Sequence, residues 1–105
     1  MFGAFDLQAG NDLVSFKKAF DGFCEHLRQQ GHVHSWRLWE RLPHGGYDNR
    51  PPPVPILVEM RFHDHPASLA CYKYVEANQE PLRTLHRSMN QQINDTFFAL
   101  YRELG

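Results

Sequence analysis

The segment Ile56–Phe62 constrains the fold of this chain more than any other stretch. Every second residue in it is apolar and points to one face: Ile56, Val58, Met60 and Phe62. The opposite face mixes one large apolar residue with two opposite charges: Leu57, Glu59 and Arg61. A period of two is typical of a strand. The apolar face predicts ordinary core, whereas the mixed face indicates an interface or a lined cavity rather than plain solvent surface.

The length and charge of the chain exclude several classes of protein. Its 105 residues leave room for a single domain. The formal net charge is -1 with both signs interspersed, so no extended cationic surface is available for nucleic acid or anionic lipid. No stretch approaches the roughly 18 apolar residues that a membrane span needs, and no secretory signal pattern is present. We expect one cytoplasmic domain, residues 1–105, that binds neither nucleic acid nor membrane.

The first third of the chain is predicted to form a strand, a helix and a strand. Residues 2–8 alternate weakly until Gly10 interrupts them. Asn11 is a good N-cap for a helix that ends at Gly31. An apolar stripe with spacings of three and four follows this helix: Leu13, Phe16, Phe20, Phe23 and Leu27. Residues 32–41 alternate again and predict the second strand.

Turn-forming residues separate the second strand from the third. Residues 43–53 are polar and rich in glycine and proline, which predicts a long hairpin connection. Pro55 cannot donate to a sheet ladder, so the third strand is predicted to pair from Ile56 onward. Residues 96–102 alternate as well and predict a fourth strand at the end of the chain.

The region between the third and fourth strands is predicted to be helical. Asp64 and Pro66 suit a helix start, and Pro81 either kinks this helix or divides it into two. The first part has an inward side formed by Leu69, Tyr72 and Val75. The apolar spacing of the second part continues through Leu82, Leu85, Met89 and Ile93.

The order β-α-β-β-α-β predicts an α+β domain with a ferredoxin-like arrangement. This is a four-stranded antiparallel sheet, strand order 4-1-3-2, with helices on one face. The face toward the helices collects apolar residues: Phe5, Leu7, Trp36, Leu38, Ile56, Val58, Met60, Phe62, Phe98 and Leu100. The opposite face, the outer face, carries charges and aromatic rings: Asp6, Arg37, Trp39, Leu57, Glu59, Arg61, Phe97 and Tyr101.

The outer face is too apolar for a monomer. Trp39, Phe97 and Tyr101 are aromatic side chains that bury about 150–250 Å² each. Together they reach or exceed the largest exposed patch of a typical monomer, about 300–600 Å². We therefore expect a homodimer in which two outer faces meet and form an α+β barrel. The enclosed rings would be either a wall for a planar ligand or a hydrophobic plug of the dimer.

The outer face also carries four charges that balance to zero. Antiparallel pairing allows a register with Arg37 opposite Glu59 and Ser35 opposite Arg61, and Asp6 borders the third strand from the other side. One interpretation is a satisfied structural network. The other is a site in which an arginine holds a carboxylate or enolate while Asp6 or Glu59 acts as a base.

Five of the histidines raise the question of a site. His32, His34, His63 and His65 lie at the same end of the predicted hairpin, which invites a metal site. The parity of the strands turns His34 toward the helices and His63 toward the outer face, so we predict no metal site here. His86 lies near the buried stripe of the last helix, as either a histidine bonded to a backbone carbonyl or a candidate catalytic residue.

Cys24 and Cys71 are the only cysteines, and both lie in predicted helices on or near apolar faces. Thiols in such positions usually act as small hydrophobes. We do not expect a disulfide, because reducing compartments disfavour one.

The order of the elements and several short segments resemble the dimeric α+β barrel superfamily. This superfamily includes antibiotic-biosynthesis and haem-degrading monooxygenases, muconolactone isomerases and stress-responsive barrel proteins. Within it the chain is similar to a small bacterial family that is a domain of unknown function. The segments spread over nearly the whole chain: Phe5-Asp6-Leu7, Trp36-Arg37-Leu38, Leu85-His86, Asn90 and Phe98-Ala99-Leu100-Tyr101-Arg102.

The resemblance implies a homodimer with a cavity between the sheets that binds a small aromatic or carbonyl-bearing molecule. The residues expected to bind it are Arg37, Trp39, Arg61, Phe97 and Tyr101. One alternative is a cofactor-independent monooxygenase or isomerase with Asp6, Glu59 or His86 as catalytic residue, and another is a structural dimer with a filled barrel. Haem-degrading relatives use an Asn, a Trp and a helical His. Because Asp6 stands in place of that Asn, no haem or other cofactor is expected.

Overall fold

The computed structural model describes residues 1–43, 46–48 and 54–105, so most of the predicted connection 43–53 lies outside the described residues. The elements in this part of the chain are β1 (Phe2–Leu7), α1 (Leu13–Gln29), β2 (Ser35–Glu40), β3 (Ile56–Arg61), α2 (His65–Glu76), α3 (Leu82–Asn90) and β4 (Ile93–Ala99). The strands pair antiparallel in the order β2-β3-β1-β4, which is 4-1-3-2 when counted from the opposite edge. The predicted α+β class is confirmed.

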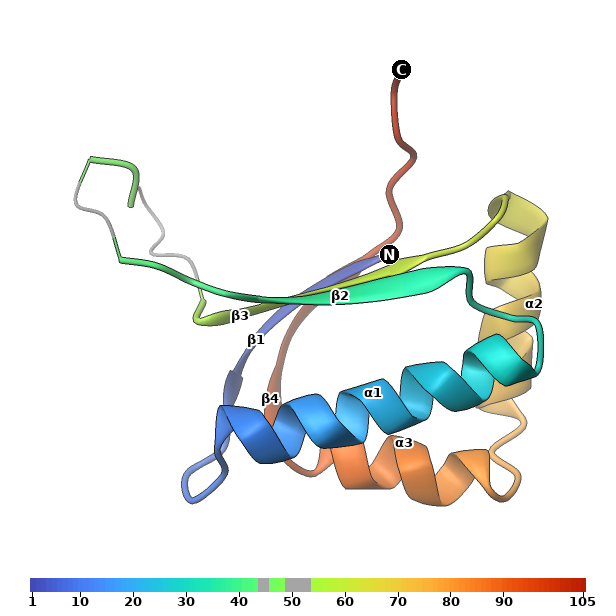
Figure 1. Ribbon diagram of the computed structural model, residues 1–105, viewed down its shortest axis with the longest axis horizontal. Coiled ribbons are helices and arrows are strands. Elements are labelled where there is room, and N and C mark those ends of the chain that lie inside the picture. Colours follow the sequence, from blue (N-terminus) through green and yellow to red (C-terminus); the bar gives the residue numbers. More distant parts are fainter. Residues whose placement is uncertain (44–45, 49–53) are drawn as a thin grey trace.

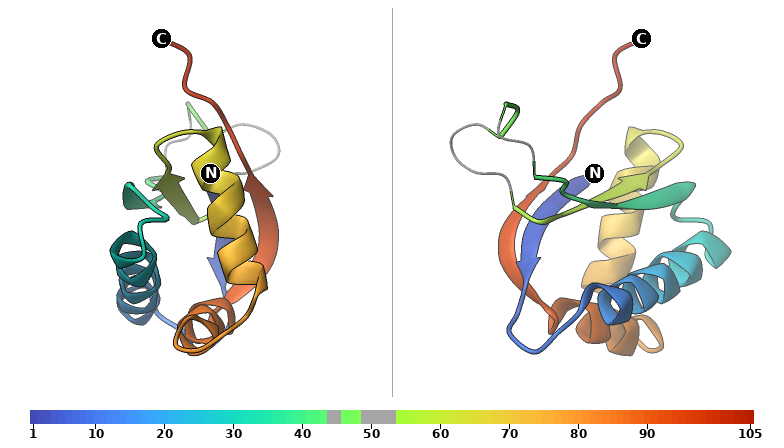
Figure 2. Two further views of the ribbon diagram at one scale, coloured as in Figure 1. Left: turned by 90° about the vertical axis from the view of Figure 1, so that its right-hand side faces the viewer. Right: turned by 60° about the vertical axis from the view of Figure 1, so that its left-hand side comes forward.

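The helices lie on the same side of the sheet (Figure 1). Two of them, α1 and α3, run side by side beneath it, whereas α2 stands across the end where β3 finishes (Figure 2). Close backbone contacts join α1 to α3 and to β2, and α3 to β4, whereas α2 makes few with any element. The sheet therefore holds α2 less closely than α1.

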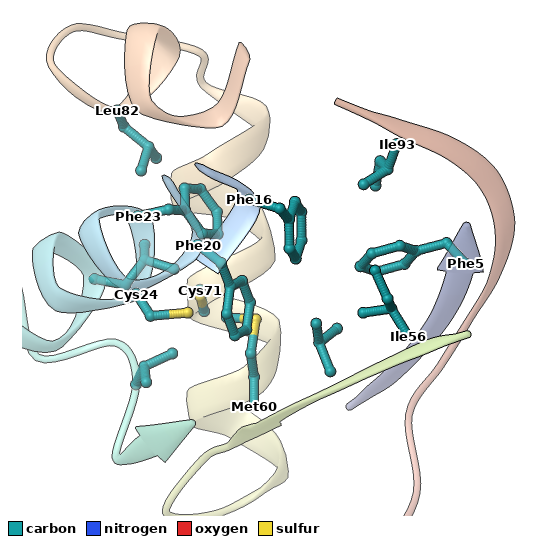
Figure 3. Packing of buried hydrophobic residues seen from close by; sticks show 13 residues of the cluster. Phe5, Phe16, Phe20, Phe23, Cys24, Ile56, Met60, Cys71, Leu82 and Ile93 are labelled. Carbon is teal, nitrogen blue, oxygen red and sulfur yellow. The ribbon is translucent and has the colours of Figure 1, made fainter. Parts of the chain in front are cut away.

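The apolar stripe of α1 is the centre of the core, as the sequence predicts. Its buried residues are Phe16, Phe20, Phe23, Cys24 and Leu27. Figure 3 shows the side chains that face them from three strands: Phe5 of β1, Ile56 and Met60 of β3, and Ile93 of β4. The rings of Phe5 and Phe16 meet edge-on with a centroid distance of 5.1 Å. Helix and sheet thus share one packed layer of aromatic and aliphatic side chains.

The N-cap of α1 is Asp12, so the prediction of Asn11 was wrong by one residue. The Asp12 carboxylate accepts a hydrogen bond from the Ser15 backbone N–H at 2.7 Å. This bond lowers the pKa of Asp12. The Asn11 amide instead donates to the carbonyl of Gln8 at 3.3 Å. Asn and Asp are equally good caps, so residue type could not separate the two positions.

The region after β3 is divided into two helices, which is one of the two arrangements that Pro81 allows. The first, α2, begins after Asp64, whose side chain caps it. The expectation that Leu69 points inward was wrong, because its side chain is 47% exposed. The inward side of α2 instead passes through Ser68 and Cys71, which are both buried. Within the described residues, no helix has the length and hydropathy of a membrane span.

The last strand, β4, begins earlier and ends earlier than predicted. Ile93 was assigned to the apolar stripe of the last helix, but it is the first residue of β4 and pairs with Leu7 of β1. Its buried side chain fits both a helical spacing and a strand, so periodicity alone could not decide between them. Leu100 and Tyr101 lie beyond the end of β4 at Ala99.

Cys24 and Cys71 are both buried free thiols. Burial raises the pKa of both groups, that of Cys71 to about 11, and the two are close enough for charge on Cys71 to raise the pKa of Cys24 further. They pack in the core cluster as the small hydrophobes that the sequence predicts.

We expect Phe20→Ala to lower the free energy of unfolding by about 3–5 kcal/mol, because it removes a fully buried ring and leaves a cavity. Denaturant unfolding followed by circular dichroism measures this change. Val14→Ala on the same helix is the control, since Val14 is exposed, and it should change the free energy by less than about 0.5 kcal/mol. Similar losses in the two variants would contradict the packing of α1 described above.

Candidate functional site

An apolar row crosses the strands of the outer face. The pairing registers place Trp39 beside Leu57, Leu57 beside Ala4, and Ala4 beside Phe97. Trp39 and Phe97, at the two ends of this row, remain 45% and 43% exposed. Tyr101 continues the same face beyond β4 and is 59% exposed. The structure therefore places the three predicted aromatic side chains on one open surface.

The charges of the outer face do not form the predicted network, although the predicted register between β2 and β3 is confirmed. Arg37 lies opposite Glu59, yet its guanidinium carbon is 6.0 Å from the centroid of the Trp39 ring. Asp6 accepts a hydrogen bond from the Leu7 backbone N–H at 2.8 Å. Ion pairs between these outer-face charges are absent from the described residues.

The chain end beyond β4 supplies the partner of one of these charges. Arg61, opposite Ser35, pairs with Glu103 with a distance of 2.6 Å from Nη2 to Oε2. Glu59 Oε2 is buried and has no hydrogen-bond partner within the described residues. Burial lowers the pKa of the Met1 amino group, and the nearby Glu59 carboxylate opposes this shift. Glu59 is therefore the least satisfied charge of the outer face.

A cavity lies on the other side of the sheet, between the strands and the helices. Its volume is about 320 Å³, and most of its lining is apolar. The side chains that line it include Met60 and Phe98 from the sheet, Phe16 and Phe20 from α1, Val75 from α2 and Met89 from α3. Residues of α2 form one part of the wall and strand residues another, so the hollow lies where the helices and the sheet do not close on each other.

Phe98 marks the open side of this cavity. It was predicted to be core, yet it is 51% exposed. Its ring lies over Gly3, its partner in the register, where an added Cβ atom would come within 2.5 Å of the ring. Leu100 is likewise exposed rather than core, since the chain leaves the sheet at Ala99. The core prediction failed at these two residues because strand parity gives the face of a side chain and not how far that face is covered.

His86 and Asn90, one turn apart on α3, add polar groups to the cavity wall. His86 Nε2 and Asn90 Nδ2 are 3.0 Å apart, and the imidazole stacks on the Phe23 ring with a centroid distance of 5.2 Å. The predicted backbone carbonyl partner of His86 is thus replaced by a side-chain amide. Burial lowers the pKa of His86. Such a neutral imidazole can exchange a hydrogen bond or a proton with a bound molecule.

The predicted divergence of the two histidine pairs was wrong. The rings of His34 and His63 are in contact, with a centroid distance of 4.7 Å. Both residues lie beyond the ends of the paired strands, so strand parity does not govern them. His32 instead stacks on Tyr74 at 4.5 Å. Groups of three or more metal-binding side chains are absent from the part of the chain that the structure describes.

Sequence reasoning placed the site on the outer face and missed the cavity. The residues that line the cavity have the spacing of ordinary core, so periodicity gave no sign of a hollow. One signal was available in α3. There His86 and Asn90 stand four residues apart next to Met89, and all three border the cavity.

Residues 2–105 match a family of unknown function, DUF6614. The chain belongs to DUF6614. Comparison with curated proteins and with solved structures found no match. The match agrees with the resemblance to a domain of unknown function, and it brings no activity to this member of DUF6614. Its function has to be argued from the cavity and the outer face.

The lowered pKa of His86 predicts how the stability of this DUF6614 member depends on pH. As the pH falls, His86 becomes protonated near pH 6.5 in the unfolded chain and only at a lower pH in the folded chain. The free energy of unfolding therefore decreases as the pH falls below about 6.5. His86→Gln should reduce the loss of melting temperature between pH 7 and pH 5. His65→Gln, at an exposed histidine, is the matched control and should behave as wild type. Identical pH profiles for wild type and His86→Gln would contradict this assignment.

Proposed function

We propose that this protein is a homodimer that binds a small, largely apolar molecule in the cavity between its sheet and its helices. The observation that carries the proposal is the cavity, whose volume of about 320 Å³ lies in the range of known ligand sites, about 300–1,000 Å³. The hollow is open to solvent on one side, where the exposed Phe98 lies, so a small molecule can reach it.

The size and lining of the cavity restrict the class of ligand. An apolar cavity of about 150 Å³ holds benzene, so twice that volume suits two fused rings. The phenylalanine and methionine side chains of the wall favour an aromatic body. His86 and Asn90 favour a carbonyl or hydroxyl group at one end of it. This is the aromatic or carbonyl-bearing class of ligand that the sequence suggested.

The homodimer in this proposal is supported by the outer face. Monomeric proteins rarely expose an apolar row that includes two large aromatic rings, as this face does. The sheet of a second copy would cover the row and form an α+β barrel with the first. In this arrangement the residues once predicted to bind a ligand between the sheets belong to the dimer interface: Arg37, Trp39, Arg61, Phe97 and Tyr101. The aromatic rings then act as the plug of the barrel.

A second candidate function is a cofactor-independent monooxygenase or isomerase that uses the same cavity. Asp6 and Glu59 project from the outer face, so of the three candidate catalytic residues His86 is the one that borders the cavity. In such an enzyme neutral His86 would accept a proton from an enolisable substrate. Asn90 would hold the imidazole in place.

The cavity proposal predicts that Val75→Phe weakens the binding of 2-naphthol at least tenfold, because the added ring fills space that the ligand needs. Fluorescence titration of 2-naphthol measures the affinity. Leu69→Phe introduces the same side chain on the exposed side of α2 and should bind as wild type does. If all three proteins bind with one affinity, or wild type does not bind aromatic probes at all, the cavity is not the site.

The homodimer proposal predicts that light scattering of the wild type gives twice the mass of one chain. Phe97→Lys should produce the mass of a single chain, because it places a charge in the apolar row of the outer face. Val14→Lys, at an exposed position on the helix side, should leave the mass unchanged. A wild-type mass of one chain at micromolar concentration would contradict the homodimer.

A further inference from the structure

Glu59 holds a polar atom that the chain itself leaves unpaired. Its Oε2 atom is buried and lacks a hydrogen-bond partner within residues 1–43, 46–48 and 54–105. In the same row of the outer face, Glu59 lies between Phe2 of β1 and Arg37 of β2. A buried carboxylate oxygen without a partner is unfavourable, because it has lost water and gained nothing. Because Glu59 is only partly buried as a residue, its side chain can turn outward and bring this oxygen to a partner on the outer face.

Two positive groups near Glu59 are engaged elsewhere in the chain. The Met1 amino group, which feels the charge of Glu59, donates a hydrogen bond to the Met60 carbonyl at 2.8 Å. Arg61, on the same strand and face, pairs with Glu103. Neither group supplies a hydrogen bond to the buried oxygen.

Arg37 is the third positive group near Glu59, and it lacks a carboxylate partner. It lies directly opposite Glu59 in the register, is exposed, and contacts the Trp39 ring rather than a carboxylate. Arg37 takes part in none of the ion pairs among the described residues. An unpaired cation and an unpaired carboxylate thus stand next to one another on the face that we propose is covered.

We infer that Arg37 of a second copy binds Glu59, and that Arg37 of the first copy binds Glu59 of the second. This inference rests on the proposed homodimer and names the polar contacts that hold it. In a twofold interface each contact between two different residues occurs twice, so adjacent Arg and Glu residues satisfy each other in both copies. The guanidinium fork can offer two parallel hydrogen bonds to one carboxylate.

The charge pattern favours a second copy over another partner. The outer face carries Asp6 and Glu59 against Arg37 and Arg61, so it has no net charge. A strongly acidic or strongly basic partner would meet two like charges on this face. A second copy related by a twofold axis that passes between β2 and β3 instead sets Arg37 of each copy against Glu59 of the other. Trp39 and Leu57, the next pair in the register, would pack beside these contacts and exclude water from them.

A charge exchange between two variants tests the inference. Arg37→Glu and Glu59→Arg each place like charges across the proposed interface, so each alone should raise the dimer dissociation constant at least a hundredfold in analytical ultracentrifugation. An equimolar mixture restores both opposite pairs in a heterodimer. The mixture should therefore dimerise within tenfold of wild type, and native mass spectrometry should show one chain of each variant in the dimer. Circular dichroism checks that each variant is folded, and Glu59→Gln gives a milder second test, with about tenfold weaker dimers.

A control variant and the oligomeric state of the wild type separate the failure of this inference from the failure of the proposed function. Lys18→Glu, an exposed charge reversal on α1, should dimerise as wild type does. If wild type itself is a monomer, the homodimer falls and the contact falls with it. If wild type is a dimer but the mixture stays monomeric, the contact alone is wrong. Restoration of Glu59→Arg by Arg61→Glu instead of Arg37→Glu would likewise overturn the assigned partner.

Discussion

The structure depends on the division of β3 into two faces of different chemistry. The strand lies inside the sheet between β2 and β1, so both of its faces need a covering. On one face Ile56, Val58 and Met60 are buried in the same core cluster as the phenylalanine stripe of α1. On the other face Leu57 and Glu59 are only partly covered by the chain. The first face forms the core of the domain, and the second is the face that the proposed second copy would cover.

The sequence predicted the layout of the fold because its strongest signals are local and periodic. The alternation in β3 and the stripe of α1 each repeat several times, so a single misplaced residue does not hide them. Boundaries were less certain wherever one residue satisfied two patterns. Ile93 fits a helical spacing as well as a strand, and Asn11 caps a helix as readily as Asp12 does. The assignment of Leu69 to the inward side failed because α2 is half buried and carries a weak stripe.

The candidate cavity could not be predicted in the same way, since it arises from the distance between elements rather than from any one of them. Phe98 has the parity of a core residue, yet half of its side chain is exposed at the border of the cavity. The prediction of ion pairs on the outer face failed for a related reason. Pairing geometry brought Arg37 opposite Glu59, but the orientation of each side chain follows from its surroundings, here the Trp39 ring and the chain end at Glu103. A long side chain can adopt several orientations, and the strand register does not select among them.

The loose attachment of α2 has a consequence for how a molecule would reach the cavity. Elements with few close contacts open locally at a lower free energy than the core around them. Here α2 makes few close backbone contacts and is held mainly by side chains, with Cys71 in the core and Tyr74 bonded to His26 of α1. An outward swing of α2 would widen the open side beside Phe98 without breaking any strand pairing. Uptake and release would then be governed by the frequency of this swing, and the rest of the domain could stay as rigid as a stable core requires.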